Sequence, residues 1–359
     1  MIKKLLTYAL CGVLLLIFII LYKAYAHQPT FKEVSNTHNI ILDDSKSIQN
    51  LSKSITFKTV SHPNYEKFDY EEFEKFLSWL EEEYSLIFEK LEKKYIGKSL
   101  LLKWQGNNNN LNPILLTGHY DVVPVDDGSG LAWINKPFAG IIDDDYIWGR
   151  GALDDKSGVI AILEAINYLL TKNFVPERTA FFAFGFDEEI GGNRGAAKIA
   201  EFFIEEQITL EWSLDEGSFL LEDIIPGVNK PIAIINVAEK GGLTLEIISK
   251  SKGGHSSMPP SKTAVGYLAE AIIKLEENPL PGKLEGLSLE LFDNISRHMS
   301  FQRKILFANL WLFEPFINRA LSKSPSMNAV IRTTTAPTML SASERANVLA
   351  TNAVGTVNF

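Results

Sequence analysis

Apolar residues occur in short runs that alternate with longer stretches of helical spacing over the first two thirds of the chain. Short runs closed by turn-forming residues predict buried strands, here at residues 99–105, 113–117, 179–186 and 232–237. Apolar groups at helical spacing predict helices in residues 65–95 and 154–172. Alternating strands and helices indicate an α/β fold, with a mainly parallel twisted sheet between helices.

The pattern changes after residue 240. Residues 243–249 alternate between apolar and polar, as in a half-exposed strand, and residues 263–277 have helical spacing. We therefore expect a smaller, second α+β domain. The expected division is an N-terminal segment 1–26, a linker 27–60, a first domain 61–240 and a second domain 241–359.

The N-terminus begins with Lys3 and Lys4 and continues as an apolar stretch over residues 5–22, about long enough to span a bilayer. The small-x-small sequence of residues 24–26 is typical of a cleavage site. Either a signal anchor or a cleaved signal peptide fits. Both predict export: membrane-anchored by residues 5–22, or secreted, periplasmic or vacuolar after cleavage.

The composition of the 359 residues is that of a globular protein, with 46% hydrophobic and 22% charged residues. Residues 1–240 carry 23 Lys and Arg against 35 Asp and Glu, which argues against a nucleic-acid partner. Cys11 is the only cysteine, so an intrachain disulfide or a cysteine metal site is excluded. A metal held by His, Asp and Glu would be zinc, manganese or cobalt.

Three adjacent carboxylates, at residues 187–189, follow the strand predicted at 179–186. Their mutual repulsion next to a core calls for a bound cation. Other candidates are His119 and Asp121 after a second strand, Asp154 and Asp155 at a helix start, Asp215 after a short apolar run, and His255 in a Gly/Ser/Pro loop. Each alone also fits an ordinary role, such as a helix cap for Asp155 or a turn residue for Asp215.

In their order and spacing, these motifs resemble the dinuclear zinc peptidase family of aminoacylase, succinyl-diaminopimelate desuccinylase and carboxypeptidase S, most closely the carboxypeptidase S-like subgroup. The resemblance covers residues 60–359. It implies a catalytic metallopeptidase domain at 61–240 and a lid/dimerisation domain at 241–359, with a possible homodimer. It also implies two zinc ions and a substrate that is a peptide or an N-acyl amino acid, cleaved next to a free carboxylate.

The resemblance also implies a role for each matching residue. His119, Asp154 and Asp215 would hold one zinc, and Asp154 and Glu189 the other, with Asp154 bridging. Glu188 would be the general base, and Asp121 would orient His119. His255 would polarise the scissile carbonyl, and Asn347 would help to bind the substrate carboxylate.

The chain departs from the family pattern at the final metal ligand. Family members carry a histidine for this role toward the C-terminus, and no matching motif is found here. Nothing around His298 resembles that motif, so the second zinc site would lack this ligand. We expect a truncated lid domain and a poorly active chain. The alternatives are an N-acyl amino acid hydrolase or a non-catalytic remnant that binds metal or dimerises. The apolar residues 301–316 predict an acyl-chain wall, a membrane-facing surface or the packing face of an inserted helix.

Overall fold

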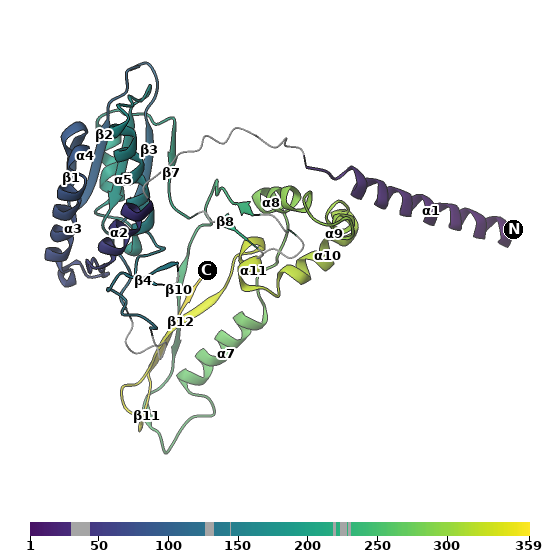
Figure 1. Ribbon diagram of the computed structural model, residues 1–359. Coiled ribbons are helices and arrows are strands. Elements are labelled where there is room, and N and C mark those ends of the chain that lie inside the picture. Colours follow the sequence, from purple (N-terminus) through teal and green to yellow (C-terminus); the bar gives the residue numbers. More distant parts are fainter. Residues whose placement is uncertain (30–43, 126–132, 144, 218–219, 223–227, 229–230) are drawn as a thin grey trace. The chain divides into compact units, whose positions relative to one another are not determined.

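The computed structural model describes residues 1–29, 44–125, 133–143, 145–217, 220–222, 228 and 231–359 (Figure 1). The chain forms two compact units. Residues 37–217 form the sheet unit, and residues 1–36 together with 218–359 form the split unit. This division falls at residue 217, whereas the predicted domain boundary is at residue 240, and the predicted domain roles stay predictions.

The sheet unit is built on a five-stranded sheet of order β1-β2-β6-β3-β7. These strands are β1 (Glu92–Ile96), β2 (Ser99–Trp104), β3 (Ile114–His119), β6 (Ala180–Gly185) and β7 (Trp212–Leu214). Strand β3 is parallel to both β6 and β7, whereas β2 is antiparallel to β1 and β6. All strands except β2 therefore point the same way, which confirms a mainly parallel sheet.

Helices cover both faces of this sheet, as the apolar runs predict. One face packs against α3 (Tyr70–Glu83), α4 (Ser85–Lys90) and α5 (Lys156–Thr171), and the other against α6 (Ala196–Glu205). Successive residues of β6 point to opposite faces, so Phe182 and Phe184 enter the first core and Phe181 the second. A strand buried on both sides needs an apolar residue at every position.

Two segments of the sheet unit differ from the sequence-based expectation. The predicted helical stretch ends early, because residues 92–96 form β1 and pair with β2. The predicted linker contains α2 (Asp44–Ile55), which packs on α5 and buries Asn50, Ser54 and Ile55. Residues 30–43 of that linker lie outside the described residues. A separate hairpin of the sheet unit consists of β4 (Ile141–Asp143) and β5 (Tyr146–Trp148).

The split unit contains a second, antiparallel sheet of order β10-β14-β12. Its strands are β10 (Thr244–Lys250), β12 (Ala336–Ser341) and β14 (Asn352–Asn358). Helix α7 (Ala264–Glu277) begins at the Thr263 cap and packs through Leu268 against Ala353. The short strands β11 (Gly254–His255) and β13 (Val348–Leu349) pair separately. An antiparallel sheet with a helix on one face is the expected α+β arrangement.

The other helices of the split unit share a small core. They are α8 (Gly286–Ser296), α9 (Phe301–Phe307), α10 (Leu310–Leu321) and α11 (Pro325–Ile331). Phe292, Ile317 and Ile331 are buried in this core. The apolar stretch 301–316 therefore forms helices, and one side of it packs inward.

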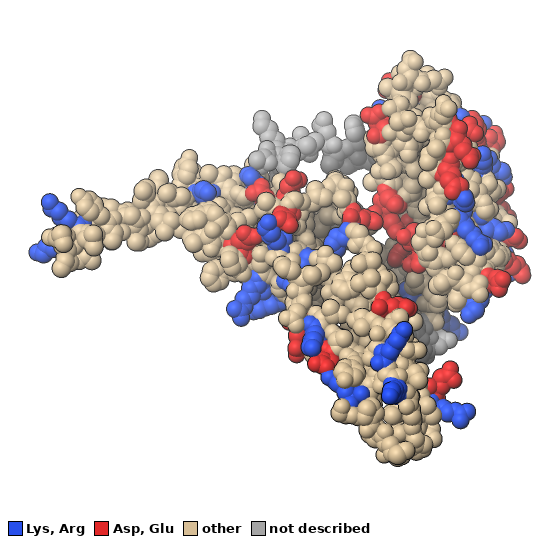
Figure 2. All heavy atoms as spheres, turned by 180° about the vertical axis from the view of Figure 1, so that it is seen from behind, with Lys and Arg blue, Asp and Glu red and all other residues tan. Residues whose placement is uncertain are grey.

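Helix α1 (Ile2–Ala26) is the one described helix that is long and apolar enough to cross a membrane. Nearly all its side chains are exposed. Figure 2 shows it as a projection with few charged residues, and two lysines, Lys3 and Lys4, lie near its N-terminal end. A helix that exposes apolar groups all round fits a lipid environment better than water.

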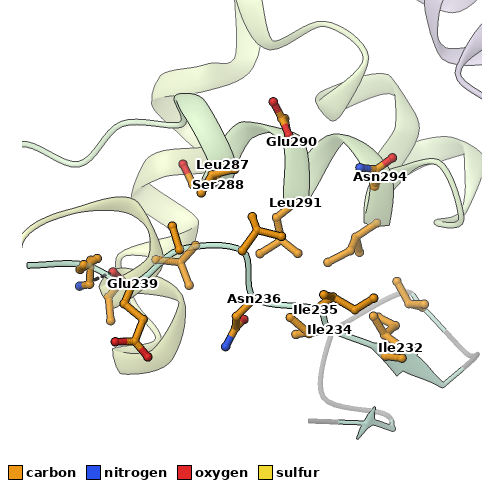
Figure 3. A pocket seen from close by; sticks show the side chains of 18 of the residues that line it. Ile232, Ile234, Ile235, Asn236, Glu239, Leu287, Ser288, Glu290, Leu291 and Asn294 are labelled. Atoms are coloured by element: carbon orange, nitrogen blue, oxygen red, sulfur yellow. Dashed lines mark hydrogen bonds between the residues drawn. The ribbon is translucent and has the colours of Figure 1, made fainter. Parts of the chain in front are cut away.

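The split unit also holds an apolar cavity of about 850 Å³ (Figure 3). Val228 and residues 231–240 line one side, and α8 lines another through Leu287 and Leu291. The predicted strand at residues 232–237 is shorter than expected, because only β9 (Ile232–Ala233) pairs, with β8 (Leu220–Leu221). Ile235 and Val237 remain exposed beside the cavity, without sheet partners among the described strands.

Candidate metal centre

Polar residues gather where three parallel strands end. Strand β3 ends at His119, β6 leads into the acidic triplet 187–189, and β7 leads into Asp215 and Glu216. Parallel strands bring their carboxyl ends to one edge of the sheet, which is the usual ligand-binding edge of α/β folds. The start of α5 adds Asp154 to the same edge.

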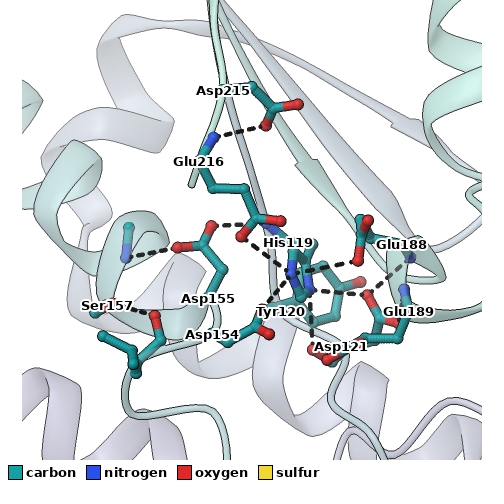
Figure 4. Close-up of polar contacts among 12 residues, drawn as sticks. His119, Tyr120, Asp121, Asp154, Asp155, Ser157, Glu188, Glu189, Asp215 and Glu216 are labelled. Carbon is teal, nitrogen blue, oxygen red and sulfur yellow. Dashed lines mark hydrogen bonds and ion pairs between the residues drawn. The ribbon is translucent and has the colours of Figure 1, made fainter. Parts of the chain in front are cut away.

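The ring of His119 is the centre of this group (Figure 4). Its Nε2 atom lies 3.0 Å from Asp154 Oδ1, 3.3 Å from Glu216 Oε2 and 3.6 Å from Glu188 Oε2. His119 is buried, whereas Asp154 and Glu188 are exposed. The ligand atoms of His119, Asp154 and Glu216 lie within 4.8 Å of one another, close enough to hold one metal ion.

The other side of the His119 ring faces Asp121. Its Nδ1 lies 3.0 Å from the Asp121 backbone oxygen and 3.3 Å from the Oδ1 atom. The Asp121 carboxylate is fully buried and accepts hydrogen bonds from the backbone N–H groups of Glu188 and Glu189, at 3.0 and 3.2 Å. One carboxylate thus connects the end of β3 to the acidic turn after β6.

Asp155 is the N-cap of α5, as its sequence position suggests. It accepts hydrogen bonds from the backbone N–H of Gly158 and from that of His119, both at 3.2 Å. A Cβ atom on Gly118 or Gly158 would lie 2.8 or 2.3 Å from the Asp155 carboxylate. Gly118 therefore allows the helix start to approach β3 closely, which brings the neighbouring Asp154 to His119, and Gly158 leaves room for the Asp155 cap.

Asp187, the first residue of the triplet, has a structural position. Its buried carboxylate accepts hydrogen bonds from the Tyr65 hydroxyl and the Arg194 backbone N–H, both at 2.8 Å. Its backbone oxygen accepts from the Gly192 N–H. Asp187 thus fixes the turn that presents Glu188 and Glu189, a role that sequence reasoning left open.

The electrostatics of the group favour a bound cation. Burial raises the pKa of Glu188 and of Glu189, and raises that of Glu216 to about 7. Neighbouring carboxylates add to each rise. Burial lowers the pKa of His119, but the hydrogen bond and charge of Asp121 and the charges of Glu216 and Glu188 outweigh it and give a pKa of about 10. One imidazole and clustered carboxylates fit zinc, and also manganese or cobalt.

The structure does not bring all the predicted ligands together. Asp215 turns away from His119 and accepts hydrogen bonds from the Thr117 hydroxyl and from the Glu216 N–H. Its neighbour Glu216, which sequence reasoning missed, takes the place near His119. Glu189 lies on the same turn as Glu188 but outside the His119 group. The only sequence signal for Glu216 is its position directly after Asp215.

The predicted substrate residues lie in the split unit, close to each other. His255 pairs with Val348 in the β11–β13 ladder, and the Ser256 N–H donates to the Asn347 backbone oxygen at 3.0 Å. His255 Nδ1 accepts from the Ser257 N–H at 3.2 Å. The proton of a neutral His255 ring is therefore on Nε2, which can donate to a ligand.

Comparison with known proteins identifies the relatives of this chain. It is 43% identical over 370 residues to a probable carboxypeptidase S-like 2 of Dictyostelium discoideum, covering 100% of this chain and 70% of that protein. It is 36% identical to an N-fatty-acyl-amino acid synthase/hydrolase PM20D1 of Xenopus tropicalis, covering 98% of this chain and 69% of that protein.

Solved structures share the fold. Human carnosine dipeptidase 1 matches with a TM-score of 0.57 at 13% identity, over 96% of this chain and 72% of that one. The M20 family metallo-carboxypeptidase Sso-CP2 of Sulfolobus solfataricus matches with a TM-score of 0.55 at 19% identity, over 87% and 70%. Residues 115–337 match the sequence profile of peptidase family M20/M25/M40. The chain therefore belongs to peptidase family M20/M25/M40 and is a hydrolase.

Proposed function

We propose that the protein is a zinc-dependent carboxypeptidase S-like enzyme that cleaves an amide bond next to a free carboxylate. The main support for this proposal is the group around His119 at the sheet edge, where the ligand atoms of one imidazole and two carboxylates lie within 4.8 Å of one another. His119, Asp154 and Glu216 would hold one ion, and Asp215 and Glu189 are further candidates. Zinc supplies a Lewis acid that acidifies a water and polarises the scissile carbonyl.

Glu188 is the proposed proton carrier. Its carboxylate lies 3.6 Å from His119 Nε2 and is half exposed, so it can reach a substrate. Burial raises its pKa, which favours proton uptake from the attacking water and delivery to the leaving amine nitrogen. Asp121 would hold the His119 ring and, through the N–H groups of Glu188 and Glu189, the position of this base.

Residues 241–359 are proposed as a lid and dimerisation domain. His255 would donate a hydrogen bond from Nε2 to the scissile carbonyl, and the tautomer set by the Ser257 N–H supports this role. Asn347, beside it, would bind the substrate carboxylate. We also propose that α1 anchors an exported protein in a membrane, supported by its length and apolar surface.

The test is Glu188→Gln in the protein expressed from its native gene. Hydrolysis of Gly-X dipeptides should fall by about 10²–10⁴-fold, because general acid–base catalysis contributes that much. The zinc content should stay the same. Glu89→Gln, at an exposed glutamate of α4, is the matched control and should keep full activity. Hydrolysis that survives Glu188→Gln contradicts the mechanism.

A second candidate is hydrolysis of N-acyl amino acids, favoured by the 36% identity to an N-fatty-acyl-amino acid synthase/hydrolase. An acyl chain that becomes buried on apolar groups would gain about 0.8 kcal/mol per CH₂ group. The value of kcat/KM should then rise with acyl length. Ile235→Gln, in the lining of the apolar cavity of the split unit, tests whether that cavity takes the chain and should then flatten the rise. Leu340→Gln, at another exposed apolar residue outside the cavity lining, is the control. The same slope in both variants would exclude the cavity.

A further inference from the structure

Helices α9 and α10 are apolar on two sides. Their inner side, including Phe313 and Ile317, packs into the core with Phe292. Their outer side also carries large apolar groups, and Trp311 is 57% and Phe316 is 71% exposed. We call this outer side the α9–α10 ridge: Phe301, Leu306, Trp311, Leu312 and Phe316. A helix that faces only water on its outer side normally carries polar residues there.

The ridge lies beside the C-terminal end of α1. Helix α1 packs on α9 (Figure 1), and the buried Asn309 amide donates to the Ile20 backbone oxygen at 3.1 Å. The Lys23 ammonium lies 5.9 Å from the centre of the Trp311 ring. With 25 residues, α1 is about 37 Å long, which exceeds the hydrocarbon thickness of about 30 Å. Its last turns can therefore lie at the membrane surface.

Hydrogen bonds just after α1 fix this arrangement. His27 Nε2 lies 2.8 Å from the Ser296 hydroxyl, inside the protein. Arg297 donates to the Gln28 backbone oxygen, and the Lys304 ammonium donates to the Gln28 side chain, both at 3.0 Å. These contacts tie the end of α1 to α8 and α9, so the ridge cannot turn freely about the helix.

The polar residues near the ridge suit an anionic bilayer surface. Residues 297–323 contain five Lys and Arg but only one acidic residue, Glu314. Lys304 is buried and Arg297 pairs with Asp293, which leaves Arg303, Arg319 and Lys323 to face lipid. Basic side chains next to a membrane are attracted to anionic lipid, and Trp side chains prefer the interface itself. The combination of exposed aromatic groups, basic residues and an adjoining spanning helix favours lipid over a protein partner.

We propose that the α9–α10 ridge inserts into the membrane interface as a second attachment beside α1. The proposal rests on the proposed membrane anchor. The bilayer would cover Trp311 and Phe316, and the pair of attachments would fix the orientation of the split unit on the membrane. This function is separate from hydrolysis.

The experiment places nitroxide spin labels in the full chain, reconstituted in vesicles of phosphatidylcholine and phosphatidylserine. The native Cys11, exposed within α1, reports on the anchor. In a Cys11→Ser background, Phe316→Cys reports on the ridge, and Met339→Cys, at a 67% exposed residue of β12, is the control. Relaxation by oxygen, which concentrates in lipid, is compared with relaxation by a water-soluble nickel complex.

The proposal expects the labels at Cys11 and at Phe316→Cys to favour oxygen, with the second label shallower, and Met339→Cys to favour nickel. A lipid signal at Cys11 together with a water signal at Phe316→Cys overturns the ridge proposal but keeps the anchor. A water signal at Cys11 overturns the anchor itself. Equal lipid signals at Phe316→Cys and Met339→Cys would indicate non-specific adsorption and also overturn the ridge.

Discussion

The two units place their apolar and charged groups in opposite ways. The sheet unit buries many aromatic residues, among them Phe76, Tyr120 and Phe184, and gathers a group of carboxylates around His119 at one edge of the sheet. The split unit exposes large apolar groups on α1, on the α9–α10 ridge and beside the cavity. The first unit buries a large aromatic core, although apolar residues such as Ile134 and Ile204 remain exposed. The second leaves apolar surface for a ligand, a membrane or further protein to cover.

The same substitution, Phe to Ala, should have very different effects on stability in the two units. Phe184→Ala removes a fully buried ring in β6 and should destabilise the sheet unit by about 3–5 kcal/mol. Phe316→Ala removes an exposed ring and should change the stability of the split unit by less than about 0.5 kcal/mol. Urea unfolding followed by near-ultraviolet circular dichroism measures both. Similar losses in the two variants would mean that the units do not differ in this way.

The sheet core could be predicted from sequence because its strands are continuous apolar runs between turn residues. The runs at 99–105, 113–117 and 179–186 became β2, β3 and β6. The pattern at 92–96 was misleading because consecutive exposed polar groups on an edge strand look like the exposed face of a helix. The run at 232–237 was misleading because only Ile232 and Ala233 pair as a strand, while Ile235 and Val237 stay exposed beside the cavity.

The candidate site was partly predictable for a similar reason. His119, Asp121, Asp154 and Glu188 stand in fixed motifs at strand ends and at a helix start, and the structure brings them together. The choice between Asp215 and Glu216 depends on how the chain leaves β7 and on the hydrogen bond from Thr117. That geometry is tertiary, and no residue pattern encodes it.

In the sheet unit, the buried Asp121 carboxylate holds both the His119 ring and the acidic turn after β6. Asp121→Asn should weaken zinc binding by about 10–100-fold, because carboxylates that orient ligand imidazoles contribute that much. The variant keeps the size of the buried group, and circular dichroism checks that the fold is intact. Asp143→Asn, at an exposed residue of β4, is the control. Chelator competition measures the affinity, and an unchanged value would remove Asp121 from this role.

Proton release tests the same cluster. Without metal, His119 has a pKa raised to about 10, so it is protonated at pH 7, and Glu216, with a pKa of about 7, is half protonated. Metal binding must displace these protons, so affinity should rise with pH up to about 10, by up to about tenfold per pH unit for each proton. Calorimetry in buffers of different ionisation enthalpy should detect release of about one proton or more at pH 7. No release would contradict the proposed ligands.

A weak pH effect is expected at the contact between the end of α1 and helices α8 and α9. Burial, together with the charges of Arg297 and Lys304, lowers the pKa of His27 below 6.5, although Asp293 opposes this. At acidic pH, His27 therefore binds more protons when the end of α1 is undocked and unfolded than when it is docked on α8 and α9. The stabilisation by neutral His27 is complete above about pH 6.5 and is lost as the pH falls through the lowered value.

Hydrogen exchange of the backbone amides of α8 and α9, corrected for the intrinsic pH dependence, should accordingly speed up on acidification. His27→Gln stays neutral and should remove this pH response, whereas His62→Gln in the sheet unit should keep it. The effect is small because hydrogen bonds from Arg297 and Lys304 to Gln28 hold the same contact at every pH. An identical pH response in His27→Gln would show that the docking of α1 does not depend on this imidazole.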